Sequence, residues 1–185
     1  MNHYIDIQLL PDAEFKVTSL MNSLYSKLHK VLCDYKSTSI GVSFPEIKKT
    51  PGSKLRIHGS QSDLDNLMEV GWIGGMRGYC EVSQVMPVPD TVHHRTLSRH
   101  QPEKTMAKLR RLKNRGHSTE DKLDAYQENL QQHDAKMKGP YLELQSGSSG
   151  HRYRRYLVLG DVNNHSKEGK FDQFGLSKTA TLPYF

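Results

Sequence analysis

Cysteine is scarce in this sequence. Among its 185 residues only Cys33 and Cys80 are cysteines, and they lie too far apart to form a CxxC pair. A disulfide framework and a zinc knuckle are therefore not expected. The ten histidines form no HxxxH motif and no Cys/His cluster, whereas a stable zinc site needs three or four protein ligands. We expect no metal ion and no other cofactor.

Long apolar runs are missing as well. No segment approaches the roughly 20 apolar residues of a membrane-spanning helix. The N-terminal residues MNHYIDIQLL lack the basic segment and the small-residue cleavage site of a secretory signal. Together with two cysteines that show no disulfide pattern, these absences predict a protein of the reducing cytoplasm.

Acidic residues are nearly absent from one segment, residues 95–117. It carries eight Lys or Arg and a single acid, Glu103, so its net charge of +7 exceeds the +6 of the whole chain. Positive charge that is concentrated in one short segment indicates a polyanionic partner, whereas a basic composition spread evenly says little.

Most of this basic segment is predicted to form a helix over about residues 102–116. Pro102 suits the first turn of a helix, and Glu103 lies near its positive end. Helical spacing places cations along one face, beside an apolar stripe of Met106, Leu109 and Leu112; the cations are Lys104, Lys108, Arg111 and Arg115. The alternative is an ordinary solvated face. Because acidic i,i+4 partners are missing, nucleic-acid binding is favoured.

The N-terminal half has the pattern of an α+β domain. Strands are predicted near residues 3–10, 40–44, 55–57 and 79–88. Helices are predicted over about 18–35 and around 64–68, the second capped by Ser60 or Ser62. The β-α-β-β-α-β order is typical of the ferredoxin-like fold, which by itself identifies no function. We predict such a domain over residues 1–90.

Residues 91–185 are predicted to form a smaller α+β domain. Pro87 and Pro89 mark the boundary before it. This domain would contain the basic helix, a polar helix from Ser118, and three short strands at 141–144, 152–159 and 170–174. The glycine- and serine-rich loop QSGSSG joins the first two of these strands.

His29 is the candidate catalytic residue. The acidic side chains form no cluster of the kind that holds the cations of a metal-dependent nuclease. RNA can be cut without metal, because its 2′-OH attacks the adjacent phosphodiester once a base removes the proton. His29 lies at the edge of the apolar face of the first helix, and histidine titrates near neutral pH. Considered alone, a histidine at such a position is more often structural.

Two further residues are candidates for RNA contacts. Ser146, within QSGSSG, could hold the ribose hydroxyl or a phosphate oxygen, although in isolation it is more often a linker serine. Tyr153 lies among His151, Arg152, Arg154 and Arg155. It could stack on a base, as aromatic residues of basic strands do; otherwise it is an ordinary strand tyrosine.

Several motifs occur together in one order along the chain. These are KLH (27–29), IGVSFP (40–45), SRxQ (98–101), the arginine-rich helix, the Ser-Gly loop, and FGLSK (174–178) before a Pro-aromatic end. With them the chain resembles, over essentially its whole length, the CRISPR repeat-processing endoribonucleases of type I-F systems. These are the Csy-type members of the pre-crRNA endonuclease superfamily. IGVSFP and GLSK are fairly specific, and the joint order is more so.

The resemblance implies a fold, an activity and partners. It implies a ferredoxin-like domain followed by a domain whose arginine-rich helix lies in the major groove of a repeat hairpin. The activity would be metal-independent cleavage at the 3′ base of the hairpin by 2′-OH attack, leaving a 2′,3′-cyclic phosphate and a 5′-OH. The protein would then keep the crRNA and stay with the other subunits of the RNA-guided surveillance complex.

The resemblance also implies roles for single residues. His29 matches the base, Ser146 the hydroxyl that fixes the 2′-OH, and the nearby Ser148 a support for the scissile phosphate. Arg99 and Gln101 match a pair that reads base edges, and Tyr153 an aromatic that stacks on the bottom of the stem. The phosphate-binding helix would contribute Lys104, Lys108, Arg111, Arg115 and His117.

The sequence departs from the family pattern at some positions. Phe174 stands where the family has tyrosine before GLSK, which removes a hydroxyl but keeps a ring able to pack against His29. In the basic helix Leu112 and Gly116 stand where arginine is common, and Lys108 replaces an arginine with its bidentate fork. A non-catalytic subunit that caps the crRNA hairpin is therefore the alternative function. A DNA-binding regulator is a distant third.

Overall fold

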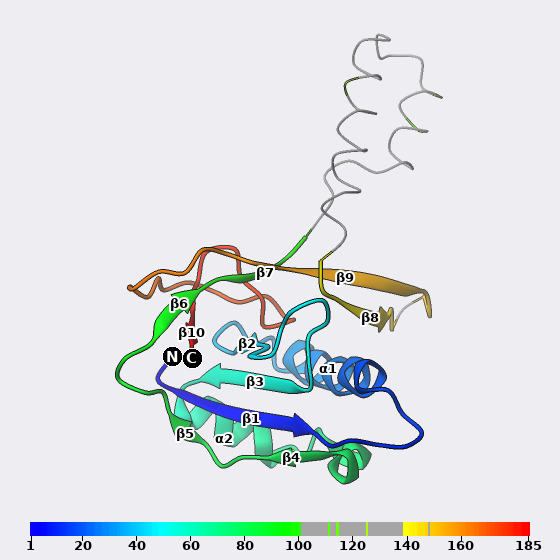
Figure 1. The fold of residues 1–185 in the computed structure, drawn as a ribbon, viewed down its shortest axis with the longest axis horizontal. Coiled ribbons are helices and arrows are strands. Elements are labelled where there is room, and N and C mark those ends of the chain that lie inside the picture. The colour runs from blue at the N-terminus through cyan, green and yellow to red at the C-terminus, as the bar shows by residue number, and fades with distance from the viewer. Residues whose placement is uncertain (101–110, 112–113, 115–124, 126–138, 148) are drawn as a thin grey trace. The chain divides into compact units, whose positions relative to one another are not determined.

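The computed structural model describes residues 1–100, 111, 114, 125, 139–147 and 149–185 (Figure 1). The chain divides into two compact units, one formed by Met1–Arg99 with Pro140–Phe185 and the other by His100–Gly139. The predicted boundary near residue 90 lies inside the first unit, and the division into domains 1–90 and 91–185 stays a prediction. The predicted basic and polar helices lie almost wholly outside the described residues, although Arg111, Asn114 and Ala125 have helical backbone.

The first unit is built on an antiparallel sheet. Its strands are β1 (His3–Leu9), β2 (Gly41–Ser43), β3 (Lys54–Gly59) and β4 (Cys80–Val82), in the order β2-β3-β1-β4. The predicted alternation of β1 is confirmed, because Ile5, Ile7 and Leu9 are buried and the residues between them are not. Ile5 and Ile7 lie opposite the buried Ile57 and Leu55 of β3, which places one apolar face towards the core.

Two helices complete this part of the core. Helix α1 (Val17–Asp34) buries one apolar stripe, formed by Leu20, Met21, Leu24, Tyr25, Leu28, Val31 and Leu32. Helix α2 (Gln61–Glu69) begins after Ser60, whose hydroxyl accepts the Asp63 N–H at 3.1 Å, so the predicted cap is confirmed. Tyr35, the last residue of the predicted helix 18–35, is 54% exposed, because the helix ends at Asp34 and Lys36 turns the chain with φ +50°.

The C-terminal strands pack on the same core. Strands β7 (Leu97–Arg99), β9 (Arg152–Leu159) and β8 (Tyr141–Gln145) form a sheet in the order β7-β9-β8, and β6 (His93–Arg95) pairs with β10 (Leu182–Tyr184). Figure 1 shows α1 between the first sheet and the β8–β9 hairpin, in contact with both. The Glu143 N–H donates to the Asn22 side chain at 3.0 Å, and this bond ties β8 to α1.

Two predicted strands differ from the structure. The predicted strand 79–88 is two short pieces, β4 and β5 (Met86–Pro87), both paired with β1; between them the Ser83 hydroxyl accepts the Asp6 N–H. The predicted strand 170–174 is wrong. The Asp172 carboxylate accepts the N–H groups of Phe174 and Leu176 there, and this bonding turns the chain back on itself.

None of the helices in the described residues has the length and apolar character that a membrane span requires.

Candidate active site

His29 lies on α1 where the helix meets the turn after residue 172. Its Nδ1 is 2.8 Å from the backbone oxygen of Gln173. A carbonyl oxygen can only accept, so Nδ1 carries the proton and Nε2 keeps its lone pair. The contact of Nε2 with Cys33 Sγ, at 3.8 Å, is weak. The half-buried imidazole is therefore fixed in the tautomer that can accept a proton at Nε2.

An aromatic ring fixes the plane of this imidazole. Phe174 stacks on His29 with 3.5 Å between ring centroids and 15° between planes. The guanidinium carbon of Arg155 lies 3.5 Å from the Phe174 centroid. Two groups at this distance from one centroid cannot share a face of the ring without overlapping, so Phe174 is held between imidazole and guanidinium.

The turn that carries Phe174 is fixed by several bonds. Besides the Asp172 bonds, the buried Tyr25 hydroxyl donates to the Phe174 backbone oxygen at 2.6 Å. The Val42 N–H donates to the Gly175 oxygen at 2.9 Å. Gly175 has φ +67°, and a Cβ there would lie 2.8 Å from Val42 Cγ1, so only glycine fits. Strand β2 and helix α1 thus hold Phe174 in place.

The surroundings of His29 lower its pKa. Partial burial is the main cause, because it disfavours the charged imidazolium. The bond to Gln173 raises the pKa, the Arg155 charge lowers it, and the Asp172 charge raises it. The net lowering leaves His29 neutral at neutral pH, which is the state that a general base needs.

Cys33 lies one helical turn after His29. Its thiol donates to the Gln173 side-chain oxygen at 3.4 Å and lies 3.5 Å from His29 Nδ1. Burial raises the pKa of the thiol, followed by the negative charges of Asp34 and Asp172. Cys33 is therefore a neutral neighbour of His29 and no reactive thiolate.

A polar cavity of about 700 Å³ lies between α1 and the β8–β9 loop. Ser146 lines it together with Asn22 and Ser26 of α1. His29 is not among the lining residues, but Ser26 precedes it by three positions, so the two residues are neighbours on the surface of the helix. The loop is closed by bonds from Ser146 N–H to the His151 oxygen and from Gly150 N–H to the Ser146 oxygen. The structure thus places Ser146 across a cavity from the part of α1 that ends one helical turn before His29.

The candidate RNA-binding residues that the structure describes are Arg99, Tyr153 and Arg111. Tyr153 lies opposite the buried Leu144, and Arg99 opposite the buried Leu157, so both point to the face of the β7-β9-β8 sheet that carries Arg155. Arg111 is exposed on helical backbone of the second unit. The other candidates lie outside the described residues; they are Gln101, Lys104, Lys108, Arg115, His117 and Ser148.

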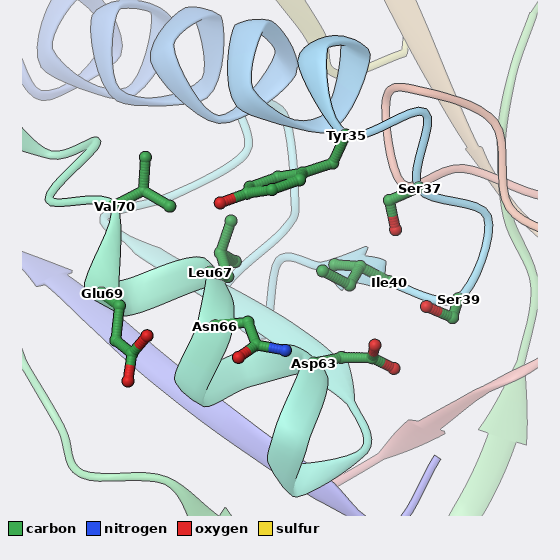
Figure 2. Close-up of a pocket in the computed structure, with 9 residues that line it drawn as sticks. All are labelled: Tyr35, Ser37, Ser39, Ile40, Asp63, Asn66, Leu67, Glu69 and Val70. Carbon is green, nitrogen blue, oxygen red and sulfur yellow. The ribbon is translucent and has the colours of Figure 1, made fainter.

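A second pocket, of about 550 Å³, lies between the end of α1 and α2 (Figure 2). Figure 2 shows Tyr35, Leu67 and Val70 beside it, with the Asp63 and Glu69 carboxylates at its edge. No lysine or arginine is among its lining residues. Carboxylates without a cation disfavour a polyanion, so this pocket is no candidate for an RNA site.

Metal ligands are not clustered in the part of the chain that the structure describes. No group of three or more His, Cys, Asp or Glu side chains there could hold an ion. The expectation that the protein uses no metal stays a prediction.

The expectation that the Phe174 ring can pack against His29 is confirmed, but sequence reasoning missed the other residues around His29. Gln173 was predicted to lie in a strand, Tyr25 was not singled out, and Arg155 was noted only as a basic neighbour of Tyr153. The Asp-x-x-Gly spacing of Asp172 and Gly175 was a usable turn signal. Nothing in the sequence links Arg155 to His29, because their shared contact with Phe174 depends on how remote segments pack.

The chain matches the family described as "CRISPR-associated protein (Cas_Csy4)" over residues 4–185. It is 38% identical over 186 residues to the "CRISPR-associated endonuclease Cas6/Csy4" of Escherichia coli (strain UTI89 / UPEC). It is 34% identical over 190 residues to the protein of the same name from Pseudomonas aeruginosa (strain UCBPP-PA14). Both matches cover 100% of each chain.

Among solved structures the chain is similar to the one described as "Structure A of CRISPR endoribonuclease Cse3 bound to 19 nt RNA". The sequences are 13% identical, the match covers 99% of this chain and 100% of that one, and the TM-score is 0.37. We draw nothing on fold or function from a likeness of this size. The match over residues 4–185 and the full-length relatives do decide the family, and the chain belongs to the Cas_Csy4 family of CRISPR-associated proteins.

Proposed function

We propose that this protein is an endoribonuclease that binds the repeat hairpin of CRISPR precursor RNA and cuts at its 3′ base without a metal ion. The observation that carries the proposal is the state of His29. Its proton is held at Nδ1 by the Gln173 oxygen, its Nε2 lone pair is available, and its pKa is lowered chiefly by burial. Membership of a family whose relatives are named endonucleases supports the activity.

The chemistry follows from this tautomer. Nε2 takes the proton of the ribose 2′-OH at the cleavage site, and the 2′-oxygen attacks the adjacent phosphorus. The bond from phosphorus to the 5′-oxygen breaks and that oxygen takes up a proton from water, which leaves a 2′,3′-cyclic phosphate and a 5′-OH, while the imidazolium returns its proton to solvent. A positioned general base contributes on the order of 10²–10⁴ in rate. In-line placement of the 2′-oxygen supplies much of the remainder.

Ser146 and Phe174 are proposed to set the geometry. The Ser146 hydroxyl, beside the cavity along α1, would hold the 2′-OH in line, with Ser148 supporting the scissile phosphate. Phe174 would keep the imidazole plane fixed by stacking on it. A phenylalanine is sufficient for this task, because stacking requires the ring and not a hydroxyl.

RNA binding is proposed to use cations and aromatic rings outside this centre. Arg99 and Gln101 would read base edges, and Tyr153 would stack on the bottom of the stem. The basic helix would neutralise phosphates through Lys104, Lys108, Arg111, Arg115 and His117. The protein would then keep its product and remain with the other subunits of the type I-F surveillance complex.

We propose that the first sheet and its two helices form the ferredoxin-like domain expected from the sequence. The order β2-β3-β1-β4 with antiparallel neighbours supports this assignment.

The second candidate function is a non-catalytic subunit that caps the crRNA hairpin. Phe174 favours it, because the hydroxyl of the family tyrosine is missing beside the proposed base. The two functions differ in strand scission. Both predict tight binding of the hairpin, but only the enzyme cuts it.

The test is cleavage of a labelled repeat hairpin in excess EDTA. Wild-type protein is expected to cut it. His29→Ala, and a substrate with 2′-deoxyribose at the cleavage site, are expected to abolish cutting while the RNA stays bound. His165→Ala is the matched control, because it removes an exposed histidine that is not among the charges acting on His29.

Each other outcome has a distinct meaning. Tight binding with no cutting by the wild type supports the capping subunit. Cutting that disappears in EDTA alone means that a metal ion takes part. Equal cutting by His29→Ala overturns the assignment of the base.

A further inference from the structure

The stack on His29 extends to a third member, Arg155. The guanidinium carbon of Arg155 and the imidazole of His29 lie at 3.5 Å from opposite faces of Phe174. A cation within about 6 Å of an aromatic centroid is attracted by the ring. Phe174 is therefore held from both sides, and the guanidinium blocks the ring from moving away from His29.

Strand β9 aims Arg155 at this ring. Arg155 lies opposite the buried Leu142 of β8, so its side chain enters the face of the sheet that packs towards the core. It is half-buried, and its Nε is enclosed without a hydrogen-bond partner. Its Nη2 lies 3.5 Å from the Tyr153 hydroxyl, and no carboxylate among the described residues lies within ion-pair distance of it.

An unpaired, partly enclosed guanidinium is costly unless something compensates for it. Cation–ring attraction to Phe174 and to Tyr153, whose centroid is 5.6 Å away, offsets part of this desolvation penalty. A purely structural arginine would gain more from a carboxylate partner. The placement is therefore better explained by what the cation does to its neighbours.

We infer that Arg155 is a positioning residue for His29: its guanidinium clamps Phe174 against the imidazole and keeps a positive charge beside it. The inference rests on the proposed function, since it gives Arg155 a part in cleavage only if His29 is the base. It concerns a residue that would touch neither the 2′-OH nor the phosphate and would act through the Phe174 ring.

The charges that face His29 come from different elements. Arg155 of β9 acts against the imidazolium, and Asp172 in the turn after β9 favours it. Tyr25 and Cys33 of α1 are neutral, because the pKa of each is raised mainly by burial. Removing the positive charge at 155 leaves Asp172 unopposed. The pKa of His29 should then rise towards its ordinary value, and less of the histidine is neutral in mildly acidic solution.

Three variants separate the charge from the stacking. Arg155→Met keeps an unbranched side chain and removes the charge. Arg155→Lys keeps the charge and removes the planar group. Arg154→Met is the control, because Arg154 lies on the same strand, is exposed on the opposite face and pairs with Glu143 at 3.1 Å.

The first measurement is an NMR titration of the His29 imidazole in the RNA-free protein. Arg155→Met is expected to move the His29 pKa upward, Arg155→Lys to move it less, and Arg154→Met to leave it in place. An unchanged pKa in Arg155→Met overturns the inference. Should Arg155→Met fail to fold, Arg155→Lys decides, through the rate measurement below.

The second measurement is single-turnover cleavage with saturating hairpin across a range of pH. Arg155→Met is expected to be slower by on the order of tenfold at neutral pH, because a misaligned base loses part of its orientation advantage. Its acidic limb should shift to higher pH, and Arg155→Lys should be intermediate. Binding of the 2′-deoxy hairpin should stay within about twofold, since Arg155 is inferred to act through the Phe174 ring and not on the RNA.

The outcomes separate this inference from the proposed function. A wild-type protein that binds without cutting overturns the function. A wild type that cuts, with Arg155→Met cutting equally well, overturns only the role of Arg155. A loss of hairpin binding that matches the loss of rate also overturns it, because Arg155 would then be a phosphate ligand.

Discussion

Two histidines in this protein each lie near an arginine that stacks on aromatic rings, and they differ in what else surrounds them. His58 is fully buried in β3, its Nε2 lies 2.8 Å from the Ser43 hydroxyl, and Arg56 is two residues away on the same strand face. His29 is half-buried on α1 and is stacked on Phe174, with Arg155 behind the ring.

The two arginines are paired differently. Arg56 is 7% exposed and forms a bidentate ion pair with Asp6, at 2.7 Å from Nε and 2.9 Å from Nη2. It also donates to the Phe185 oxygen at 3.0 Å and stacks on the Phe185 ring. Arg155 makes its contacts with rings and with the Tyr153 hydroxyl, and within the described part of the chain it has no carboxylate partner.

The pKa values follow from these surroundings. Burial, then the charges of Arg56 and the N-terminus, lower the pKa of His58 to about 3, and no solvent reaches its ring. The pKa of His29 is lowered by the same two kinds of cause, burial and an arginine charge, but the imidazole stays partly open to solvent. Complete enclosure makes a histidine structural, whereas partial enclosure with one nitrogen bonded leaves a base that a substrate can reach.

Acid should separate the two histidines most strongly. Between about pH 6.5 and 3, His58 is protonated in the unfolded chain and neutral in the folded protein. The free energy of unfolding should therefore decrease as the pH is lowered through this range, by up to about 1.4 kcal/mol per pH unit from this group. The lowered pKa of His29 acts with the same sign. His58→Gln should flatten the dependence measured by chemical denaturation from about pH 7 to about pH 4. An unchanged slope would contradict the role of His58.

Replacing the two arginines should change the free energy of unfolding by different amounts. Arg56→Met leaves the mostly buried Asp6 carboxylate with only the longer, 3.9 Å contact to Lys54 Nζ, and we expect a loss of about 3 kcal/mol of unfolding free energy. Arg155→Met loses a cation–ring contact and should stay within about 1 kcal/mol of wild type. Chemical denaturation at neutral pH compares them directly. Equal losses would show that Arg155 is structural.

The contact between Phe174 and His29 can be broken without changing the Arg155 or Asp172 charge that acts on His29. Phe174→Leu removes the stacking surface and is expected to slow single-turnover cleavage by on the order of tenfold. Because Arg155 is proposed to orient the imidazole through this ring, adding Arg155→Met should cost less in Phe174→Leu than in wild type. Phe174→Tyr keeps the ring and should retain the rate. Additive losses would mean that Arg155 acts independently of the ring.

The smallest effect is expected at Tyr25. Tyr25→Phe removes the 2.6 Å bond to the Phe174 oxygen and should cost about 1 kcal/mol of unfolding free energy. Tyr35→Phe is the matched control, because Tyr35 is 54% exposed, and it should change stability by less than about 0.5 kcal/mol. A Tyr25→Phe protein as stable as the control would show that this bond is not what holds the turn.

The elements that the sequence predicted well are those with a strong local period. Alternation in residues 3–10 predicted β1, the helical apolar stripe predicted α1, and Ser60 predicted the start of α2. Each depends on residues a few positions apart, so a single stretch of sequence is sufficient to read it.

The predictions that failed concern two places where the spacing of apolar residues did not decide the structure. In one, side-chain hydrogen bonds form a turn, and in the other a helix ends. Phe171 and Phe174 alone suggest an extended strand, but the Asp172 carboxylate bonds two backbone N–H groups and forms a turn. Tyr35 continues the apolar period of α1, but the helix ends one residue before it. At Asp172 local hydrogen bonding outweighs apolar spacing, and at Tyr35 the end of the helix does.

By itself the sequence determined the α+β class, the concentration of positive charge, the family resemblance and the choice of His29 as the proposed base. Only the tertiary structure decided the state of that histidine. The Gln173 oxygen that fixes its tautomer is 144 residues away in the chain, and the Phe174 ring and Arg155 cation come from equally remote segments. A residue's type and spacing are local properties, whereas its tautomer, its pKa and its stacking depend on what folding packs against it.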